Sequence, residues 1–471
     1  MEIIDHNYVG GNFTLSQGKE YLDIFNPASG NQIGKVLMSE EADMLSAIES
    51  AKLAFPSFAN SSKKERMDYL QRLHDAVIEG LDKLSEVTIE EYGATVQRSQ
   101  WSNRYAAETF LHFKNILKDF DFERTIGESR LALVPVGVTA IMTAWNANSG
   151  SICVKLAAAI ASGCTVVIKP SELSAIQSHV LVECFDKAGL PPGVINVVHG
   201  RGDVLGSVLS THPAIAKILF TGSTMVGKII ARNAVETMKR VTLELSGKSP
   251  NIILDDADLA TAVPLAINAC FMNNGQACIA GTRLLVPEHL MPEVARIAEE
   301  TVRKIKVGDP RDEKTAIGPM ASSKQYDRIQ HYINIGIEEG AKLLVGGLGR
   351  PEGLKSGYYV QPTVFVDVTN DMTIAREEIF GPVLCIMTYR TEEEAIEIAN
   401  DTIYGLHAYV SSSNRQRAEK VASQINAGRV AINTIYHDAL APFGGFKQSG
   451  IGREGGIYGL EEQLETKVII G

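Results

Sequence analysis

The 471-residue sequence has no apolar run long enough to cross a membrane, and its first residues lack the basic start and apolar core of a secretory signal. Its longest apolar stretch, residues 156–168, is interrupted by Ser162, Gly163 and Thr165. Basic residues form no cluster, and the net charge is −11, which argues against nucleic acid or an anionic membrane as a partner. We therefore expect a small-molecule ligand, with no nucleic-acid partner and no membrane partner.

Cysteine and histidine are both sparse and scattered. The six cysteines form no C-x-x-C pair, and neither they nor the ten histidines have the spacing of metal ligands. No histidine stands as an obvious partner of a cysteine, which argues against a papain-like hydrolase. We expect no metal site, and we expect reduced thiols in a cytoplasmic protein.

The chain is roughly three times the usual domain length of about 150 residues, so two or three domains are expected. Between residues 136 and 255, short β-branched runs alternate with helical stretches such as residues 175–188 and 224–238. This alternation predicts βαβ units and a parallel sheet. A second α/β pattern follows, with helical stretches near residues 291–306 and 391–403.

Two segments fit neither α/β pattern. One is the charged stretch at residues 118–133, and the other is the C-terminal "EEQLETKVII", whose last residues alternate like a strand at a sheet edge. Such strands often pair between subunits, and a plain surface strand is the alternative.

Ligands of parallel α/β sheets lie beyond the carboxyl ends of the strands. The "FTGS" loop joins an apolar strand to a helix through Gly222 and Ser223, and a helix that starts there aims free N–H groups at an anion such as a phosphate. An ordinary helix cap is the alternative. In "KPSE", Lys169 and Glu172 end another strand and could hold ribose hydroxyls, or they could form a solvated loop.

Three further residues have the chemistry of an acyl-transfer site. Cys278, in "GQAC", has small neighbours that leave room for a substrate, although a buried structural thiol is the alternative. Glu244 ends an apolar strand, which would raise its pKa and suit a general base, and a surface carboxylate is the alternative. Asn146, in "TAWNANSG", carries an amide that could stabilise an oxyanion, or it is a turn residue.

Several motifs, taken together and in order, resemble the aldehyde dehydrogenase superfamily over essentially the whole chain. They are "NPASGNQIGKV", "KPSE", "FTGSTMVG", "LELSGKSPNIILDDADL", "GQACIAGTR", "EEIFGPV" and "PFGGFKQSGIGRE". The resemblance implies an α/β fold with a Rossmann-like cofactor domain (1–117 and 136–246), an α/β catalytic domain (247–454) and a small β oligomerisation element (118–135 and 455–471). It also implies a homodimer or homotetramer.

The same resemblance implies that Cys278 is the nucleophile, that Asn146 and the Cys278 backbone N–H hold the oxyanion, and that Glu244 activates the hydrolytic water. The implied substrate is a small-molecule aldehyde, and the implied cofactor is NAD, with NADP as an alternative. Because the Glu172 carboxylate would repel a 2′-phosphate, NAD is preferred. The residues that would bind the cofactor are Trp145, Lys169, Glu172, Gly222, Ser223, Gly227, Glu378 and Phe380.

The sequence departs from the family pattern at three places. Ala147 and Asn148 replace a phenylalanine and a proline after the oxyanion asparagine, which predicts a wider and more polar substrate channel. Ser246 stands where glycine is usual, which leaves the backbone beside Glu244 uncertain. The Tyr-His-Asp tripeptide at 436–438 lies where the family lines its substrate entrance, so a hydroxylated or charged aldehyde is at least as plausible as a long aliphatic one.

Two other functions remain open from the sequence. The first is an acylating dehydrogenase that passes the thioester to coenzyme A, which would not need Glu244 as a base for water. The second is a non-catalytic binding or structural homologue, for which the unusual "AWNAN" and Ser246 are the only support.

Overall fold

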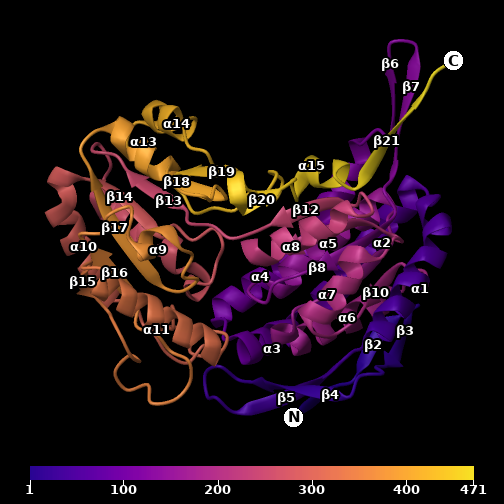
Figure 1. Ribbon diagram of the computed structural model, residues 1–471, viewed down its shortest axis with the longest axis horizontal. Coiled ribbons are helices and arrows are strands. Elements are labelled where there is room, and N and C mark those ends of the chain that lie inside the picture. The colour runs from indigo at the N-terminus through magenta and orange to yellow at the C-terminus, as the bar shows by residue number, and fades with distance from the viewer.

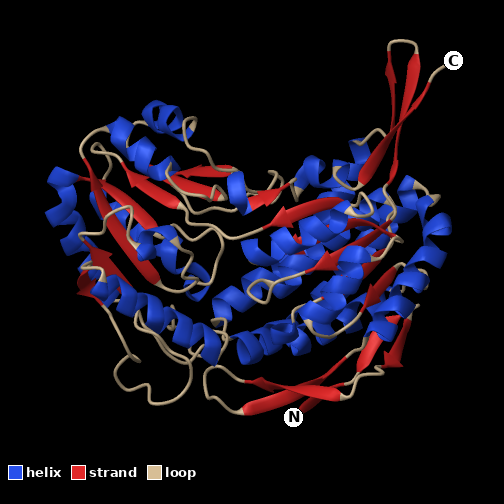
Figure 2. Cartoon of the chain, viewed as in Figure 1, coloured by secondary structure: helices blue, strands red, loops and turns tan.

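Two large sheets, each covered by helices on both faces, carry most of the chain in the computed structural model, which describes residues Met1–Gly471 (Figures 1 and 2). The first sheet has eight strands. In spatial order they are β20 (Gly450–Ile451), β12 (Arg240–Glu244), β11 (Ile215–Thr221), β8 (Val138–Met142), β9 (Val166–Lys169), β10 (Ile195–Val197), β2 (His6–Val9) and β3 (Asn12–Leu15). The five central strands, β12 to β10, run parallel, and the strands at either edge are antiparallel.

Alternate residues of the central strands enter two separate cores, because successive side chains of a strand point to opposite faces. Ile141 and Ile168 pack with one group of helices, whereas Ala140 and Val167 pack with the other. The first group is α2 (Lys63–Glu79), α4 (Val96–Asp119), α5 (Asn148–Ser162) and α6 (Ala175–Ala188). The second group is α1 (Glu41–Ala59), α7 (Gly202–Thr211) and α8 (Thr224–Val235).

The second large sheet has seven strands. In spatial order they are β15 (Lys342–Val345), β16 (Thr363–Val366), β17 (Val383–Tyr389), β14 (Arg283–Pro287), β13 (Pro250–Ile253), β18 (His407–Ser411) and β19 (Arg429–Ile432). All neighbouring pairs are parallel except β15 with β16. Its helices are α9 (Leu259–Phe271), α10 (Met291–Arg303), α11 (Ser323–Glu338), α12 (Thr373–Arg376), α13 (Glu392–Asn400) and α14 (Arg415–Ala422).

Two three-stranded sheets and two short helices complete the fold. One sheet is β1 (Glu2–Ile4), β5 (Gln32–Met38) and β4 (Glu20–Phe25), and the other is β21 (Leu464–Ile469), β7 (Ser129–Pro135) and β6 (Glu123–Ile126). The helices are α3 (Leu81–Val87) and α15 (Gly456–Glu461). Figure 1 shows the hairpin of β6 and β7 projecting away from the two large bodies, with β21 and the C-terminus beside it.

The α/β fold class and the parallel sheet expected from the sequence are confirmed. The two segments that fitted neither pattern meet in one sheet, where β21 is an edge strand that pairs with β7. The division of the chain into three domains stays a prediction, as does the oligomerisation role of this sheet. No helix has both the length and the apolar character needed to span a membrane.

The helix expected over residues 224–238 is shorter than the pattern predicted. It ends at Val235, and Met238 has a φ of 53°. A left-handed residue cannot continue a right-handed helix, and β12 begins two residues later, so the chain turns here into the next strand.

Candidate active site

The carboxyl ends of β8, β11 and β12 lie side by side, and two predicted site residues start from them. Glu244 is the last residue of β12 and pairs in register with Thr221 at the end of β11. Gly222, the first residue after β11, donates its N–H to the Glu244 carbonyl at 3.0 Å. The predicted phosphate loop and the predicted base are therefore joined through the backbone. Asn146 follows the end of β8 by four residues.

A tight turn after α9 delivers Cys278. Asn273 and Asn274 have φ angles of 54° and 59°, and Gly275 follows with 73°. A side chain at Gly275 would meet the carbonyl carbon of Gly381 at 2.3 Å, so only glycine allows this close approach. The turn therefore packs the cysteine segment directly against the "EEIFGPV" segment, which carries two of the predicted cofactor residues, Glu378 and Phe380.

Hydrogen bonds join the Asn146 segment to the cysteine segment. The Asn146 side-chain amide donates to the Gln276 carbonyl at 3.0 Å, and Asn273 donates to the Asn146 carbonyl at 2.9 Å. A side-chain amide has two N–H donors, so one donor of Asn146 stays available after this bond. The structure therefore brings the predicted oxyanion donor and the cysteine segment together.

Cys278 differs from the other cysteines in its access to solvent. It is partly exposed, whereas the other five cysteines are buried. Burial of the sulfur, followed by the charges of Glu378 and Glu244, raises the pKa of the Cys278 thiol to about 12. Backbone N–H groups of Cys278 and Ile279 act in the opposite direction. The thiol of this structure is therefore protonated at neutral pH, and a nucleophilic attack requires that its proton be removed.

Glu244 is a buried carboxylate without a hydrogen-bond partner. The residue is 3% exposed, and neither carboxylate oxygen has a partner. Desolvation raises its pKa well above the ordinary value, the charge of Glu454 raises it further, and Lys155 opposes the rise. An unpartnered buried polar group is costly, and strongly perturbed carboxylates gather at functional sites. This environment agrees with the raised pKa expected from the strand-end position.

Lys155 and Glu454 were missed in the sequence. The Lys155 ammonium lies 2.8 Å from Glu454 Oε1 and donates to Thr221 Oγ1 at 2.7 Å, and the Lys155 side chain is 1% exposed. The sequence did contain a signal that Lys155 is buried, because it is the only charged residue in the apolar segment "SICVKLAAAI". A lysine that is buried on an apolar helix needs an acidic partner, but the sequence did not show which acid it was.

Three of the residues predicted to bind the cofactor, Trp145, Glu378 and Phe380, also meet near the cysteine segment. Glu378 Oε1 accepts the Gly247 N–H at 3.0 Å, and burial raises the pKa of the Glu378 carboxyl. The rings of Trp145 and Phe380 pack edge to face, with centroids 5.4 Å apart. Phe380 has a φ of 65°, and its carbonyl accepts from Gln325 at 2.6 Å, which holds this unusual backbone in place.

The cofactor roles of the residues in the "KPSE" and "FTGS" loops stay predictions. Lys169 and Glu172 form an ion pair of 2.7 Å. Ser223 caps α8 by accepting the Val226 N–H at 3.3 Å. A Cβ at Gly222 would meet the Phe220 ring at 2.3 Å, and one at Gly227 would meet Leu245 at 2.5 Å. Both contacts are with the ends of side chains, so packing favours glycine at these two positions without requiring it.

The prediction for Asn148 was wrong. Its side chain does not make the substrate channel more polar, because the residue is 3% exposed and its Oδ1 accepts from the hydroxyls of Ser174 and Ser178. Asn148 is the first residue of α5, so its side chain turns toward α6. Ala147 is partly exposed.

The backbone at Ser246 needs no glycine. Its φ is not positive, and its carbonyl accepts the Ser449 hydroxyl at 2.6 Å. The Ser246 hydroxyl also favours the ionised form of Glu378 through a hydrogen bond, as does the Gly247 N–H. The serine is therefore compatible with the local geometry beside Glu244.

At the predicted entrance, His437 lies between two elements. Its Nε2 is 3.2 Å from the Tyr105 hydroxyl, and its Nδ1 is 3.2 Å from Arg429. Tyr436 is 75% exposed. The neighbouring Asp438 accepts the Leu440 N–H at 2.9 Å.

Comparisons with known proteins agree on one family. The model of the aldehyde dehydrogenase family matches residues 13–469. The chain is 45% identical to a 3-succinoylsemialdehyde-pyridine dehydrogenase of a Pseudomonas species and 43% identical to a putative aldehyde dehydrogenase of Staphylococcus haemolyticus, with 98% of each chain covered in both alignments.

Solved structures give the same answer. Aldehyde dehydrogenase C of Pseudomonas syringae, a cysteine-to-alanine mutant complexed with NAD+ and octanal, has a TM-score of 0.98 and 43% identity, covering 99% of this chain and 96% of its own. Betaine aldehyde dehydrogenase of Staphylococcus aureus, in complex with NAD+, has a TM-score of 0.95 and 36% identity, covering 99% and 94%. The chain belongs to the aldehyde dehydrogenase family, and its fold is that of an aldehyde-oxidising enzyme.

Proposed function

We propose that this protein oxidises an aldehyde to the free carboxylic acid with NAD as the hydride acceptor. The observation that carries the proposal is the meeting of three groups: the partly exposed Cys278, the Asn146 amide bonded to the cysteine segment, and the unpartnered carboxylate of Glu244. Each group has a chemical role in thioester formation and hydrolysis.

In the first step, Cys278 loses its proton and its sulfur attacks the aldehyde carbon. The carbonyl oxygen becomes an oxyanion, which accepts hydrogen bonds from the second N–H of the Asn146 amide and from the Cys278 backbone N–H. Because the thiol has a raised pKa, a neighbouring base must take its proton. Glu244 lies close enough for its charge to act on the thiol, and it is our candidate for that base.

The residues present fit a dinucleotide. The capped N-terminus of α8 offers backbone N–H groups to a pyrophosphate, and the Lys169–Glu172 pair is placed at a neighbouring strand end, where it can hold ribose hydroxyls. Glu378, Trp145 and Phe380 stand beside the cysteine segment, where the nicotinamide end would bind. Bound NAD supplies the acceptor for the hydride that leaves the tetrahedral adduct on Cys278. Both solved relatives described above contain NAD+.

In the second step, after the proton taken from Cys278 has passed to solvent, the Glu244 carboxylate takes a proton from water, which attacks the thioester on Cys278. The free acid leaves, and the sulfur is released. Burial makes the largest contribution to the raised pKa of Glu244; the Glu454 charge raises it further and the Lys155 charge lowers it, so this buried ion pair adjusts the basicity that burial creates.

We further propose that the sheet of β6, β7 and β21 joins subunits of a homodimer or homotetramer, since it projects from the body and ends in an edge strand (Figure 1). The segments 118–135 and 455–471 would form this element, with residues 1–117 and 136–246 binding the cofactor and 247–454 completing the catalytic domain. The six free cysteines suit a reducing compartment, and we place the enzyme in the cytoplasm.

The test is to mix the protein with NAD and a panel of aldehydes, with and without coenzyme A. Absorbance reports the reduced cofactor, and mass spectrometry identifies the acyl product. We expect free acid at the same rate in both mixtures. A coenzyme A thioester as the product would replace our proposal by the acylating reaction, and no reduction of NAD or NADP with any aldehyde would support the non-catalytic homologue.

A further inference from the structure

Arg98 lies in the first turn of α4 and contacts the segment that holds the oxyanion site. Its Nε donates to Asn273 Oδ1 at 3.2 Å, and the amide nitrogen of Asn273 donates to the Asn146 carbonyl at 2.9 Å. One side chain therefore separates the guanidinium from the backbone of the predicted oxyanion residue. The function proposed above does not use Arg98.

The charge of Arg98 has no acidic partner in the protein. No carboxylate lies within ion-pair distance of it, and its two terminal nitrogens make no hydrogen bond. Two buried arginines, Arg66 and Arg283, also lack an acidic partner, but they direct their terminal nitrogens at backbone carbonyls. A partly buried guanidinium whose two terminal nitrogens have no partner is unusual, because polar groups removed from water are normally bonded.

The Arg98 guanidinium packs against a stacked pair of aromatic rings. Arg98 lies over the ring of Trp101, 4.5 Å from the ring centroid, and Trp101 stacks on Tyr105 with an interplanar angle of 9°. The Asn273 bond occupies Nε, and the two terminal nitrogens have no partner in the protein. The edge formed by these two nitrogens matches a carboxylate, which binds a guanidinium through two parallel hydrogen bonds.

Tyr105, which stacks on Trp101, also contacts the predicted substrate entrance. The Tyr105 hydroxyl lies 3.2 Å from His437, and His437 lies 3.2 Å from Arg429. Arg429 is also a cation, but its Nε and Nη2 donate to the carbonyls of Pro442 and Ala441. Arg429 is thus anchored in the fold, whereas Arg98 has its terminal nitrogens free.

We propose that the substrate is an aldehyde that carries a carboxylate, and that Arg98 binds this carboxylate through its two terminal nitrogens. This inference rests on the function proposed above. The Asn273 bond sets the guanidinium beside the oxyanion segment, so one molecule would present its aldehyde to Cys278 and its carboxylate to Arg98.

The experiment compares charged and neutral aldehydes of similar length. We would measure kcat/KM for 4-oxobutanoate, 5-oxopentanoate and 6-oxohexanoate, each against its methyl ester, in the parent protein and in Arg98→Gln. The parent should prefer one of the carboxylates over its ester, and Arg98→Gln should reduce that ratio by about 10- to 100-fold, the usual cost of losing a hydrogen bond to a charged group. Arg98→Lys keeps the positive charge but cannot form two parallel hydrogen bonds, so it should reduce the ratio less than Arg98→Gln does.

Arg104→Gln is the matched control, because Arg104 is an exposed arginine on the same helix with no hydrogen bond or ion pair, and its ratio should match that of the parent. A parent that prefers the esters at every length overturns the inference, as does an unchanged ratio in Arg98→Gln. An equal loss for acids and esters also overturns it, since that result would make Arg98 only a support for Asn273. A failure of the proposed function would look different, because no aldehyde would then reduce the cofactor.

A second measurement does not depend on any variant. In the parent protein, succinate should compete with the preferred carboxylate-bearing aldehyde and raise the KM for that aldehyde. Succinamide at the same concentration should have no effect. Equal inhibition by the two compounds, or by neither, would overturn the inference.

Discussion

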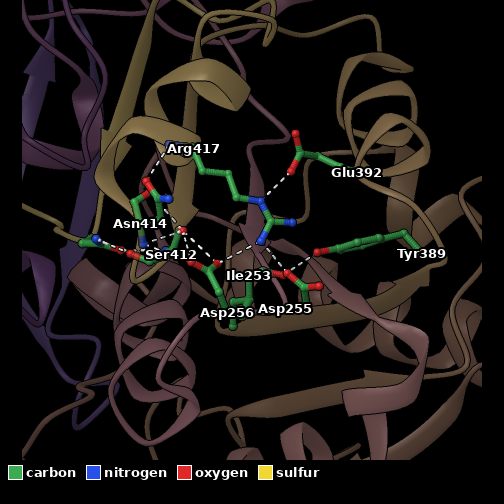
Figure 3. Close-up of polar contacts among 9 residues, drawn as sticks. Ile253, Asp255, Asp256, Tyr389, Glu392, Ser412, Asn414 and Arg417 are labelled. Atoms are coloured by element: carbon green, nitrogen blue, oxygen red, sulfur yellow. Dashed lines mark hydrogen bonds and ion pairs between the residues drawn. The ribbon is translucent and has the colours of Figure 1, made fainter.

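The end of β12 and the end of β13 both place carboxylates near cations, and each group lies at the carboxyl ends of parallel strands. After β13, Asp255 accepts from Arg417 at 2.5 Å, and Asp256 accepts from the Ser412 hydroxyl at 2.8 Å. Figure 3 shows Glu392 on the other side of the same guanidinium, where it accepts from Nε at 2.8 Å. Every charge in this group has a partner.

The carboxylate of Glu244 at the end of β12 lacks any such partner. The Arg417 guanidinium holds the pKa of Asp255 below its ordinary value, whereas burial raises the pKa of Glu244. Lys155, whose charge acts on Glu244, is bonded to Glu454 instead. Position at a strand end therefore does not by itself make a carboxylate reactive. A carboxylate paired with a cation stabilises the fold, whereas an unpaired buried carboxylate has a raised pKa and is a stronger base for catalysis.

The largest expected effect is that of Cys278→Ala, which removes the nucleophile and little volume. Turnover should fall below detection, while cofactor binding measured by calorimetry should stay close to that of the parent. The buried Cys184 serves as the control, because Cys184→Ala should retain turnover. Normal turnover in Cys278→Ala would refute the covalent mechanism.

Glu244→Gln tests the unpaired carboxylate directly. Steady-state turnover should fall by about 10²–10⁴-fold, the usual contribution of a general base. A full burst of reduced cofactor in the variant would show that a base other than Glu244 takes the thiol proton. Because only the ionised form is a base and burial raises the pKa of Glu244, parent turnover should rise with pH above the ordinary glutamate range, and this contribution of Glu244 to the rise should be absent in the variant. The exposed Glu236→Gln is the control. An unchanged steady-state rate would assign the water to another group.

Asn146→Ala removes the predicted oxyanion donor. We expect kcat to fall by about 10²–10³-fold, as for other single oxyanion donors. Asn148→Ala is a useful contrast, because the buried Asn148 side chain bonds Ser174 and Ser178. This substitution should lower the unfolding temperature and leave kcat close to that of the parent. A loss confined to KM in Asn146→Ala would make Asn146 a substrate-binding residue.

Arg417→Met breaks the paired group. Stability should fall by about 1 kcal/mol, since these ion pairs are partly exposed and screened, and turnover should stay unchanged. Asp255 has a lowered folded pKa, so its contribution is present above the ordinary aspartate value and is lost as pH falls below about 4. Thermal unfolding across that range should show this loss in the parent and not in Arg417→Met. Arg415→Met, which breaks only the exposed pair with Glu419, should have a smaller effect.

Glu172→Gln should have the smallest effect. The Glu172 carboxylate would repel a 2′-phosphate, but Lys169 at 2.7 Å offsets part of that charge, so we expect the preference for NAD over NADP to shrink by no more than about tenfold. The measurement is kcat/KM for both cofactors with one aldehyde. A parent that prefers NADP would contradict the assignment.

Much of the molecule could be predicted from the sequence, because its patterns are local. Alternating β-branched runs and helical stretches predicted the parallel strands, and residues 175–188 were predicted as a helix with the bounds that α6 has. The motifs around Cys278, Glu244 and Asn146 led to the family, which the comparisons confirm. Their catalytic roles stay predictions.

Contacts between distant segments were decided only by the tertiary structure. Asn148 looked like a channel residue in "AWNAN", but α5 turns its side chain toward Ser174 and Ser178. Lys155 and Glu454 are 299 residues apart, and Arg98 meets Asn273 across 175 residues. Sequence alone determines which side chains carry charge and which strands can form. Which charges are paired and which are left unpaired depends on how the two large sheets pack, because desolvation and distance exist only in the folded chain.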